Sequence, residues 1–445
     1  MNAFHFIIIF LCLVTSASSQ TINGSLPTTQ ENPLMDIYSI DLDGDGTDEL
    51  VATSLNIKNR KLPSAIKVFK LYEQGKFQDR TTDFFKVIPK LFHARHLLFI
   101  PDFSAGLPAL FISDHGADFA PFEGAISKLF VLDKKSHKYL DQTHQYGLDH
   151  NKGFTFASTF NHTGVNKRAL LVKANMLAVP ENAMRVKIID GRKVTMKQKM
   201  LGPMSQFEIQ ELSAKNKFKN IIDTFDQFPA SKCFMNALFA DFDGDQEDEL
   251  VIGGCDLTQK SERYIDHDLI LKKKQGKLVA WISLPKRNDE DLWGVAALYA
   301  KDLFNSKRND LVEVIYNNKF SKGKVNIFEN VEGEKFKLNQ QFTPDIKDAD
   351  FFIPWVVLID INNDHQLDII GTYRFLQEGK PYKKDGDTFF VLKNTGKTFI
   401  QEKMTFQIPR GSLMINAVKM KIKNREHLAF IDVNGKIYII DPSNK

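Results

Sequence analysis

Short apolar runs alternate with polar turns rich in Asp and Gly along most of this chain. Three segments align without gaps, namely DLDGDGTDELVATS from Asp41, DFDGDQEDELVIGG from Asp241 and DINNDHQLDIIGTY from Asp360. Each segment follows an apolar run of strand length and leads into a second run rich in Val, Ile and Leu. The repeated pattern therefore predicts a strand, a polar loop and a second strand.

Weaker copies of the same unit lie between these three, starting at Asp102, Asn161, Asp302 and Ile422. The first apolar residue after each loop marks the period, and these residues are Leu50, Leu110, Leu170, Leu250, Leu311, Ile369 and Leu428. Their spacing is 58 to 61 residues, except for an interval of 80 between Leu170 and Leu250. A regular period of this length predicts a repeat architecture over residues 21–445 rather than separate domains.

Two further strands follow the first pair within a unit. The third is represented by AIKVFKLY, GAISKLFVL, MRVKIID and KVNIFENV, and the fourth by KFQDRTTDFF, KYLDQTHQYG and KFKLNQQFTP. Seven units of four strands predict an all-β, seven-bladed β-propeller, in which radial repetition leaves few free sheet edges. A solenoid is the alternative, but such long four-stranded units suit propeller blades better.

Two segments depart from the regular unit. The last unit ends at its third strand, KIYIID, so we expect Thr21 to Thr29 to supply the missing fourth strand and close the ring. The long interval contains residues 203–231, where apolar positions recur at three- and four-residue spacing. This spacing predicts a partly helical insertion after the third blade.

The N-terminus has the pattern of an export signal. Phe6 to Val14 is an apolar run too short to span a bilayer, and the small residues TSASSQ follow it. The preceding residues contain no Lys or Arg, so an uncleaved anchor is the alternative. We predict a signal peptide over residues 1–20 and a secreted protein, extracellular or periplasmic, with no later transmembrane segment.

Cysteine usage agrees with export. Cys12 lies in the signal, which leaves Cys233 and Cys255 at similar distances on either side of the second Asp-rich loop. We predict a disulfide between them, with two free thiols as the alternative. Sequons at Asn23 and Asn161 are candidate glycosylation sites if the source is eukaryotic.

The overall charge gives no support for nucleic-acid binding. The 445 residues carry a formal net charge of +4 with no basic run, and 43% of them are hydrophobic. A nucleic-acid-binding surface requires a clustered excess of Lys and Arg.

The three Asp-rich loops place oxygen ligands at alternate positions, as calcium requires. Side-chain candidates occupy positions one, three, five and nine, and the position-seven residue offers its backbone carbonyl. The candidate ligands are Asp41, Asp43, Asp45, Thr47 and Glu49; Asp241, Asp243, Asp245, Glu247 and Glu249; and Asp360, Asn362, Asp364, Gln366 and Asp368. Up to three calcium ions would brace these hairpins, whereas the alternative is a set of ordinary solvated turns.

An EF-hand shares the beginning of this pattern but needs a Glu at position twelve. Position twelve is Ala52, Ile252 or Gly371, and the residues after the loops are β-rich. The loops DLDGDGTDEL, DFDGDQEDEL and DINNDHQLDI instead resemble those of FG-GAP/VCBS-type repeats, the family that includes the integrin α-chain propeller. The resemblance implies a seven-bladed propeller with calcium between the first and second strands of a blade.

The resemblance weakens outside these motifs. Gln246 and His365 stand where the family usually has glycine at position six. The fifth-blade loop retains Asp302 and Asp310 but replaces the middle acids, and the seventh has no acid at the ligand positions. We expect these two loops to bind no metal.

The second unit contains SDHGADFAPFEGAISKLF, which places Asp114, His115, Asp118 and Glu123 close together. These residues are a candidate ligand or metal pocket, with a structured inter-strand loop as the alternative. No nucleophile elbow, zinc-protease motif or phosphate-binding glycine loop occurs in the sequence. The sequence favours an exported binding or adhesion module for protein or glycan. The alternative is a calcium-dependent polysaccharide lyase or hydrolase, and the sequence indicates no oligomeric state.

Overall fold

The structure is a computed structural model. It describes residues 21–26, 34–56, 62–72, 76–104, 106–116, 123–150, 152–162, 169–175, 184–189, 192–197, 208–221, 234–254, 269–274, 277–284, 293–317, 322–333, 335–344, 351–375, 389–403, 406, 408, 414–432 and 434–442.

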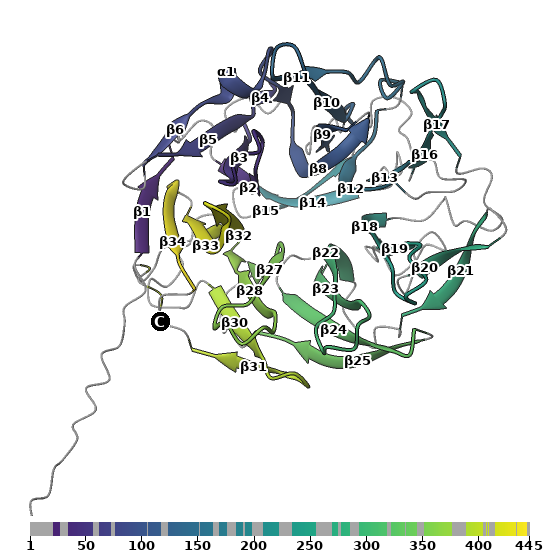
Figure 1. The fold of residues 1–445 in the computed structure, drawn as a ribbon, viewed down its shortest axis with the longest axis vertical. Coiled ribbons are helices and arrows are strands. Elements are labelled where there is room, and N and C mark those ends of the chain that lie inside the picture. The colour runs from purple at the N-terminus through teal and green to yellow at the C-terminus, as the bar shows by residue number, and fades with distance from the viewer. Residues whose placement is uncertain are drawn as a thin grey trace, which may run out of the picture.

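Seven four-stranded antiparallel sheets are arranged as blades around a central axis (Figure 1). Blade 1 contains β2 (Leu34–Ile40), β3 (Glu49–Ser54), β5 (Lys67–Leu71) and β6 (Phe77–Asp79). Blade 2 contains β8 (Ala94–Ser104), β9 (Leu107–Asp114), β10 (Lys128–Asp133) and β11 (Lys138–Asp141). Blade 3 contains β12 (Thr155–Asn161), β13 (Leu170–Asn175), β16 (Glu208–Leu212) and β17 (Phe218–Asn220). Blade 4 contains β18 (Phe234–Ala240), β19 (Glu249–Gly254), β20 (Leu269–Lys274) and β21 (Lys277–Ser283).

Blade 5 contains β22 (Trp293–Lys301), β23 (Asp310–Asn317), β24 (Gly323–Val331) and β25 (Lys335–Phe342). Blade 6 contains β27 (Val356–Ile359), β28 (Asp368–Thr372), β30 (Phe389–Asn394) and β31 (Phe399–Glu402). Blade 7 contains β32 (Met414–Ile422), β33 (Arg425–Asp432), β34 (Lys436–Ile440) and β1 (Thr21–Ser25). Three small pairs and one short helix complete the described elements: β4 (Ser64–Ala65) with β7 (Lys90–Leu91), β14 (Met184–Ile189) with β15 (Arg192–Lys197), β26 (Phe351–Phe352) with β29 (Arg374–Phe375), and α1 (Thr81–Phe84). The predicted seven-bladed, all-β propeller is confirmed.

The hydrophobic core is divided into seven clusters, one between each pair of neighbouring blades. Because successive strand residues point to opposite faces, Leu50 packs against blade 7 and Val51 packs against blade 2. The second strand of each blade is therefore apolar on both faces, which explains the unbroken Val, Ile and Leu runs of the sequence.

Ring closure follows the prediction from the sequence. β1 pairs antiparallel with β34, from Thr21 opposite Ile440 to Ser25 opposite Lys436. The Leu26 N–H donates to the Gly435 carbonyl at 2.7 Å beyond the end of this strand pair. The N-terminal segment thus supplies the outer strand of the last blade.

The predicted helical insertion after blade 3 is wrong over the described residues. Glu208–Leu212 and Phe218–Asn220 are the third and fourth strands of blade 3, joined by a turn in which Asn216 has φ 55°. The extra length is the hairpin of β14 and β15, inserted between the second and third strands of that blade. MRVKIID therefore belongs to this hairpin and is not the third strand of the blade.

Three other predictions concern segments that are only partly described. Residues 1–20, Cys233 and Cys255 lie outside the described residues, although the flanking residues Phe234 and Gly254 are paired across the hairpin. Asn161 has a buried side chain, which argues against its use as a glycosylation site. No helix in the described part of the chain is long and apolar enough to cross a membrane.

Removal of the closing strand tests how far the ring depends on it. A chain that starts at Leu26 should melt several degrees below one that starts at Thr21, because β34 keeps only β33 as a partner and becomes a free sheet edge. Thermal unfolding monitored by circular dichroism measures the difference. Equal melting temperatures for the two chains would show that β1 contributes nothing to closure.

Candidate functional site

The Asp-rich loops have one backbone conformation in common. Positions four and six are left-handed in the three acidic loops (41–49, 241–249 and 360–368) and in the fifth-blade loop (302–310). These residues are Gly44 and Gly46, Gly244 and Gln246, Asn363 and His365, and Asn305 and Lys307. In each loop the first Asp accepts the position-six N–H, as Asp41 does from Gly46 at 3.0 Å. The fifth-blade loop keeps this shape without the middle acids, so the turn does not require them.

The first two acidic loops gather their carboxylates. Ligand oxygens of Asp41, Asp43 and Asp45 lie within 4.8 Å of one another, and those of Asp241, Asp243 and Glu249 do the same. Oxygens around one calcium ion at the usual bond lengths are at most about 5 Å apart. The spacing of both groups therefore fits a calcium ion.

A buried Glu closes each of these two loops. One carboxylate oxygen of Glu49 accepts the Leu42 N–H at 2.9 Å, and Glu249 accepts the Phe242 N–H at the same distance. Burial raises the pKa of both Glu49 and Glu249 to about 7. Burial thus disfavours the charged form of both side chains, and a cation beside them would favour it.

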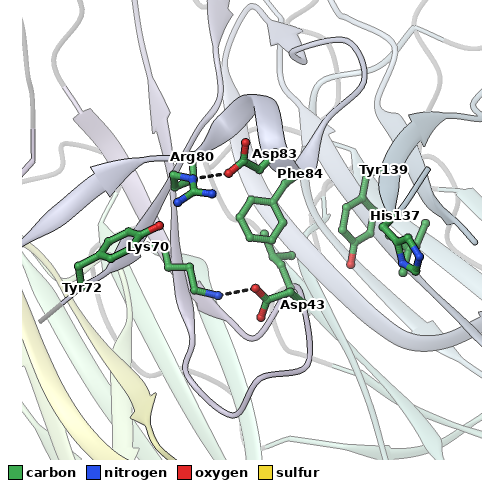
Figure 2. Close-up of a pocket in the computed structure, with 10 residues that line it drawn as sticks. Asp43, Lys70, Tyr72, Arg80, Asp83, Phe84, His137 and Tyr139 are labelled. Atoms are coloured by element: carbon green, nitrogen blue, oxygen red, sulfur yellow. Dashed lines mark hydrogen bonds and ion pairs between the residues drawn. The ribbon is translucent and has the colours of Figure 1, made fainter. Parts of the chain in front are cut away.

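In this structure a lysine supplies that cation. Lys70 on β5 contacts Asp45 at 2.8 Å and Glu49 at 3.2 Å, and it also pairs with Asp43 (Figure 2). Burial alone would lower the pKa of Lys70, but its hydrogen bonds to Asp43 and Asp45 raise it.

Lys272 on β20 has the same role in the second acidic loop. It contacts Asp245 at 2.8 Å and Glu249 at 3.6 Å, and it pairs with Asp243. In both blades the ammonium group touches the carboxylates that are the candidate metal ligands. A metal ion that bound these oxygens would have to displace the lysine.

The third acidic loop is arranged differently. One Asp368 oxygen accepts the Asn394 N–H at 2.8 Å and the other accepts the Ile361 N–H at 3.1 Å. Asn362 donates to Asp364 at 2.7 Å. Because the Asp side chain is shorter than Glu, its carboxylate is held by backbone donors, as Asp310 is in the fifth-blade loop. Among the described residues, the acids of this loop do not form a group whose ligand oxygens all lie within 4.8 Å of one another.

Hydrogen bonds connect the loops of neighbouring blades. The Asn330 amide in blade 5 donates to the Phe242 carbonyl in blade 4 at 2.7 Å. The Asn394 amide in blade 6 donates to the Leu303 carbonyl in blade 5 at 2.8 Å. Asp48 in blade 1 accepts the Lys421 N–H of blade 7 at 2.8 Å. The loops therefore form part of the contact between blades.

The predicted ligand loop of blade 2 begins at the end of β9. Asp114 is buried and accepts N–H groups of Phe92, His93 and Gly116 at 2.9 to 3.0 Å. Glu123 pairs with Lys152 at 2.7 Å, and Asp118 lies outside the described residues. Burial raises the pKa of Asp114 although the three N–H donors oppose this effect.

A pocket of about 400 Å³ lies beside the first acidic loop, between blades 1 and 2. Its walls include Asp43 and Lys70 from blade 1, Arg80 and Asp83 after β6, and Tyr139 from β11. Figure 2 shows Arg80 paired with Asp83 and Lys70 paired with Asp43. Burial raises the pKa of Tyr139, and the negative charges of Glu49, Asp41 and Asp43 add to this effect.

The sequence pattern did not predict that Lys70 and Lys272 pair with the acidic loops or that Tyr139 lines a pocket. The two lysines do share a sequence feature, because each precedes a Gln-Gly-Lys turn into the fourth strand. Recognising it requires the register between the second and third strands, which places Lys70 opposite Glu49 and Lys272 opposite Glu249. The fourth strand that was assigned to a helix, KFKN, likewise resembles KFQD and KYLD of blades 1 and 2.

No family model and no curated protein matches the chain. Among solved structures, it resembles the extracellular domain of a proposed one-component system of B. thetaiotaomicron, at 9% identity and TM-score 0.49 over 95% of this chain and 40% of that one. The chain thus spans less than half the length of that protein.

Two other similar structures have comparable scores. The Dos1 propeller matches at 12% identity and TM-score 0.42, over 96% of this chain and 95% of that one. A proposed exo-β-1,3-galactanase from Bifidobacterium bifidum matches at 10% identity and TM-score 0.36, over 72% of this chain and 93% of that one. These similarities concern the path of the chain, and they assign it neither a ligand nor an activity. The class that the structure itself defines is a seven-bladed propeller with acidic loops.

Substitution of Lys70 tests whether its ammonium group competes with calcium for the carboxylates of the first acidic loop. We expect Lys70→Met to raise the calcium affinity of the first acidic loop by at least about tenfold, because the competing ammonium group is gone. Isothermal titration calorimetry with Ca²⁺ measures the change. Lys67→Met is the matched control, since Lys67 pairs with Asp79 outside the loop at 3.2 Å. Equal affinities for all three proteins would contradict the competition.

Position six of the second acidic loop has a left-handed backbone, so substituting this residue tests whether the loop is strained. Gln246 has φ 69°, and a side chain in this conformation costs about 1–2 kcal/mol. Gln246→Gly should therefore stabilise the chain by up to about 1 kcal/mol, after the greater freedom of glycine in the unfolded chain is deducted. Gly44→Ala is the converse variant, because φ is 76° there and no neighbouring atom lies within 4 Å. Chemical denaturation measures both, and a loss of stability in Gln246→Gly would contradict the strain.

Proposed function

We propose that this chain is an exported, calcium-binding β-propeller that acts as a binding or adhesion module for protein or glycan. The observation that supports calcium most directly is the clustering of three carboxylate side chains in each of the first two acidic loops. Within each cluster the ligand oxygens lie within 4.8 Å of one another. Oxygen-rich loops of this kind suit a hard divalent cation. The proposal of export depends on the N-terminal sequence pattern.

The calcium ions in this proposal are structural. Asp41, Asp43 and Asp45 would hold one ion and Asp241, Asp243 and Glu249 another, after Lys70 and Lys272 move away. A bound divalent ion would neutralise clustered carboxylates in loops that also join neighbouring blades. Calcium would therefore strengthen the ring rather than take part in a reaction.

Binding is favoured over catalysis by the state of the buried acids. Asp114, Asp310 and Asp368 each accept two or more backbone N–H groups, so they serve the local fold. A glycoside hydrolase, one form of the alternative considered above, usually needs two carboxyl groups placed around one scissile bond. Incubation with polysaccharides and analysis of chain length tests that alternative, and calcium-dependent shortening of any of them would favour the enzyme.

Calcium should stabilise the folded chain. In excess Ca²⁺ the melting temperature should rise by several degrees relative to chelator, since saturation at a hundred times the dissociation constant contributes about 2.7 kcal/mol. Differential scanning calorimetry measures the shift, and the double variant Asp43→Asn, Asp243→Asn should abolish it.

The fifth-blade loop provides the control for this experiment. Asp302→Asn changes the first residue of a loop whose middle positions are Phe304 and Ser306, so its calcium-induced shift should match the wild type. Identical melting of the wild-type chain with calcium and with chelator would sink the metal proposal. It would leave Lys70 and Lys272 as permanent counter-ions of the loops.

A further inference from the structure

The pocket between blades 1 and 2 has a feature that the acidic loop does not explain. The Tyr139 hydroxyl is buried, and it has no hydrogen-bond partner among the described residues. Figure 2 shows this hydroxyl on the same side of the pocket as the Asp43 carboxylate. A buried hydroxyl without a partner destabilises the fold, so such groups normally have one.

Other blades of the same chain show what the fold requires at this position. The residue that faces the third strand at the equivalent register is Phe77, Leu278, Phe336 or Phe399. All four are buried and carry no polar atom. Phe336 packs its ring against Phe242 of the preceding loop, with the centroids 5.3 Å apart. The packing therefore needs only an apolar side chain, and the hydroxyl of Tyr139 is an addition specific to blade 2.

The pocket beside this hydroxyl has the size and the polarity of a small-ligand site. Its volume of about 400 Å³ lies within the usual range for ligand pockets. Two cations and two carboxylates line it, and they are paired as Lys70 with Asp43 and Arg80 with Asp83. Each of these four charged groups therefore already has a partner of opposite charge in the pocket wall.

A neutral ligand with many hydroxyl groups fits this lining. Each hydroxyl of such a ligand donates to a carboxylate and accepts from an ammonium or guanidinium group at the same time. The half-buried ring of Tyr72 offers apolar surface for the C–H face of a sugar. Arg80 lies over the Tyr72 ring, 5.7 Å from its centroid, which fixes the guanidinium at the wall.

We infer that this pocket binds a neutral sugar residue of a glycan, with the Tyr139 hydroxyl as a hydrogen-bond partner and Asp43, Asp83 and Arg80 as further polar contacts. The inference rests on the proposed binding function and narrows it to a carbohydrate ligand and one site. Asp43 belongs both to the pocket and to the first acidic loop. Calcium in that loop would therefore change the ligand affinity through a residue common to both sites.

The experiment uses the whole chain and an array of neutral oligosaccharides. The strongest glycan on the array is then titrated by calorimetry into the wild-type chain and into Tyr139→Phe. Loss of the hydroxyl should weaken binding by at least about tenfold, the effect of one hydrogen bond, while the ring still fills the core. The melting temperature should stay equal or rise, because an unpaired buried hydroxyl has been removed.

Tyr316→Phe is the matched control. Its hydroxyl is also buried, but it contacts the sulfur of Met235 at 3.5 Å in the interface between blades 4 and 5. Glycan binding by this variant should equal that of the wild type.

Each outcome has a separate meaning. If Tyr139→Phe binds the glycan as the wild type does, the pocket assignment is overturned and a glycan-binding function at another site stands. If the wild-type chain binds no neutral glycan, the carbohydrate assignment itself is overturned, and the calcium-dependent melting test still decides the metal proposal separately. If Tyr139→Phe loses stability, the hydroxyl has a partner within the protein, and the inference fails.

Discussion

Every blade of this propeller buries both faces of its sheet against neighbouring blades, and the rest of the structure depends on this arrangement. Leu50 and Val51 are adjacent in sequence, yet they pack into clusters on opposite sides of blade 1. Seven interfaces hold the ring together, and polar side chains buried inside them are paired with one another, as Lys173 is with Glu208 and Asn326 is with Glu313.

Four of the loops that join first and second strands end in a buried acid, and they hold that acid in two ways. Glu49 and Glu249 each face a lysine on the third strand. Asp310 and Asp368 are shorter, and backbone N–H groups hold them. One hairpin shape thus accommodates both arrangements, which explains how loops with and without the middle acids coexist in one ring.

The sequence predicted the elements that depend on periodicity, because a sixty-residue repeat constrains seven blades together. It predicted the closing strand for the same reason, since the last unit lacked one. It failed at the β14–β15 hairpin, where MRVKIID had the composition of a third strand. It also failed at Lys70 and Tyr139, because their roles arise from strand register and from contact between blades. Strand register and contacts between blades are three-dimensional properties, and residue spacing along the chain does not predict them.

The pairing of β1 with β34 has a consequence for the order of folding. It joins the first and last of the described strands, so blade 7 cannot be completed until β34 has been synthesised. Until this pairing forms, β34 and the flanks of blades 1 and 7 expose backbone donors and apolar surface, in a chain whose contacts are otherwise largely within or between adjacent repeats. Closure is therefore a late, long-range step, and the open ring before it is the species most exposed to chaperones, proteases and aggregation.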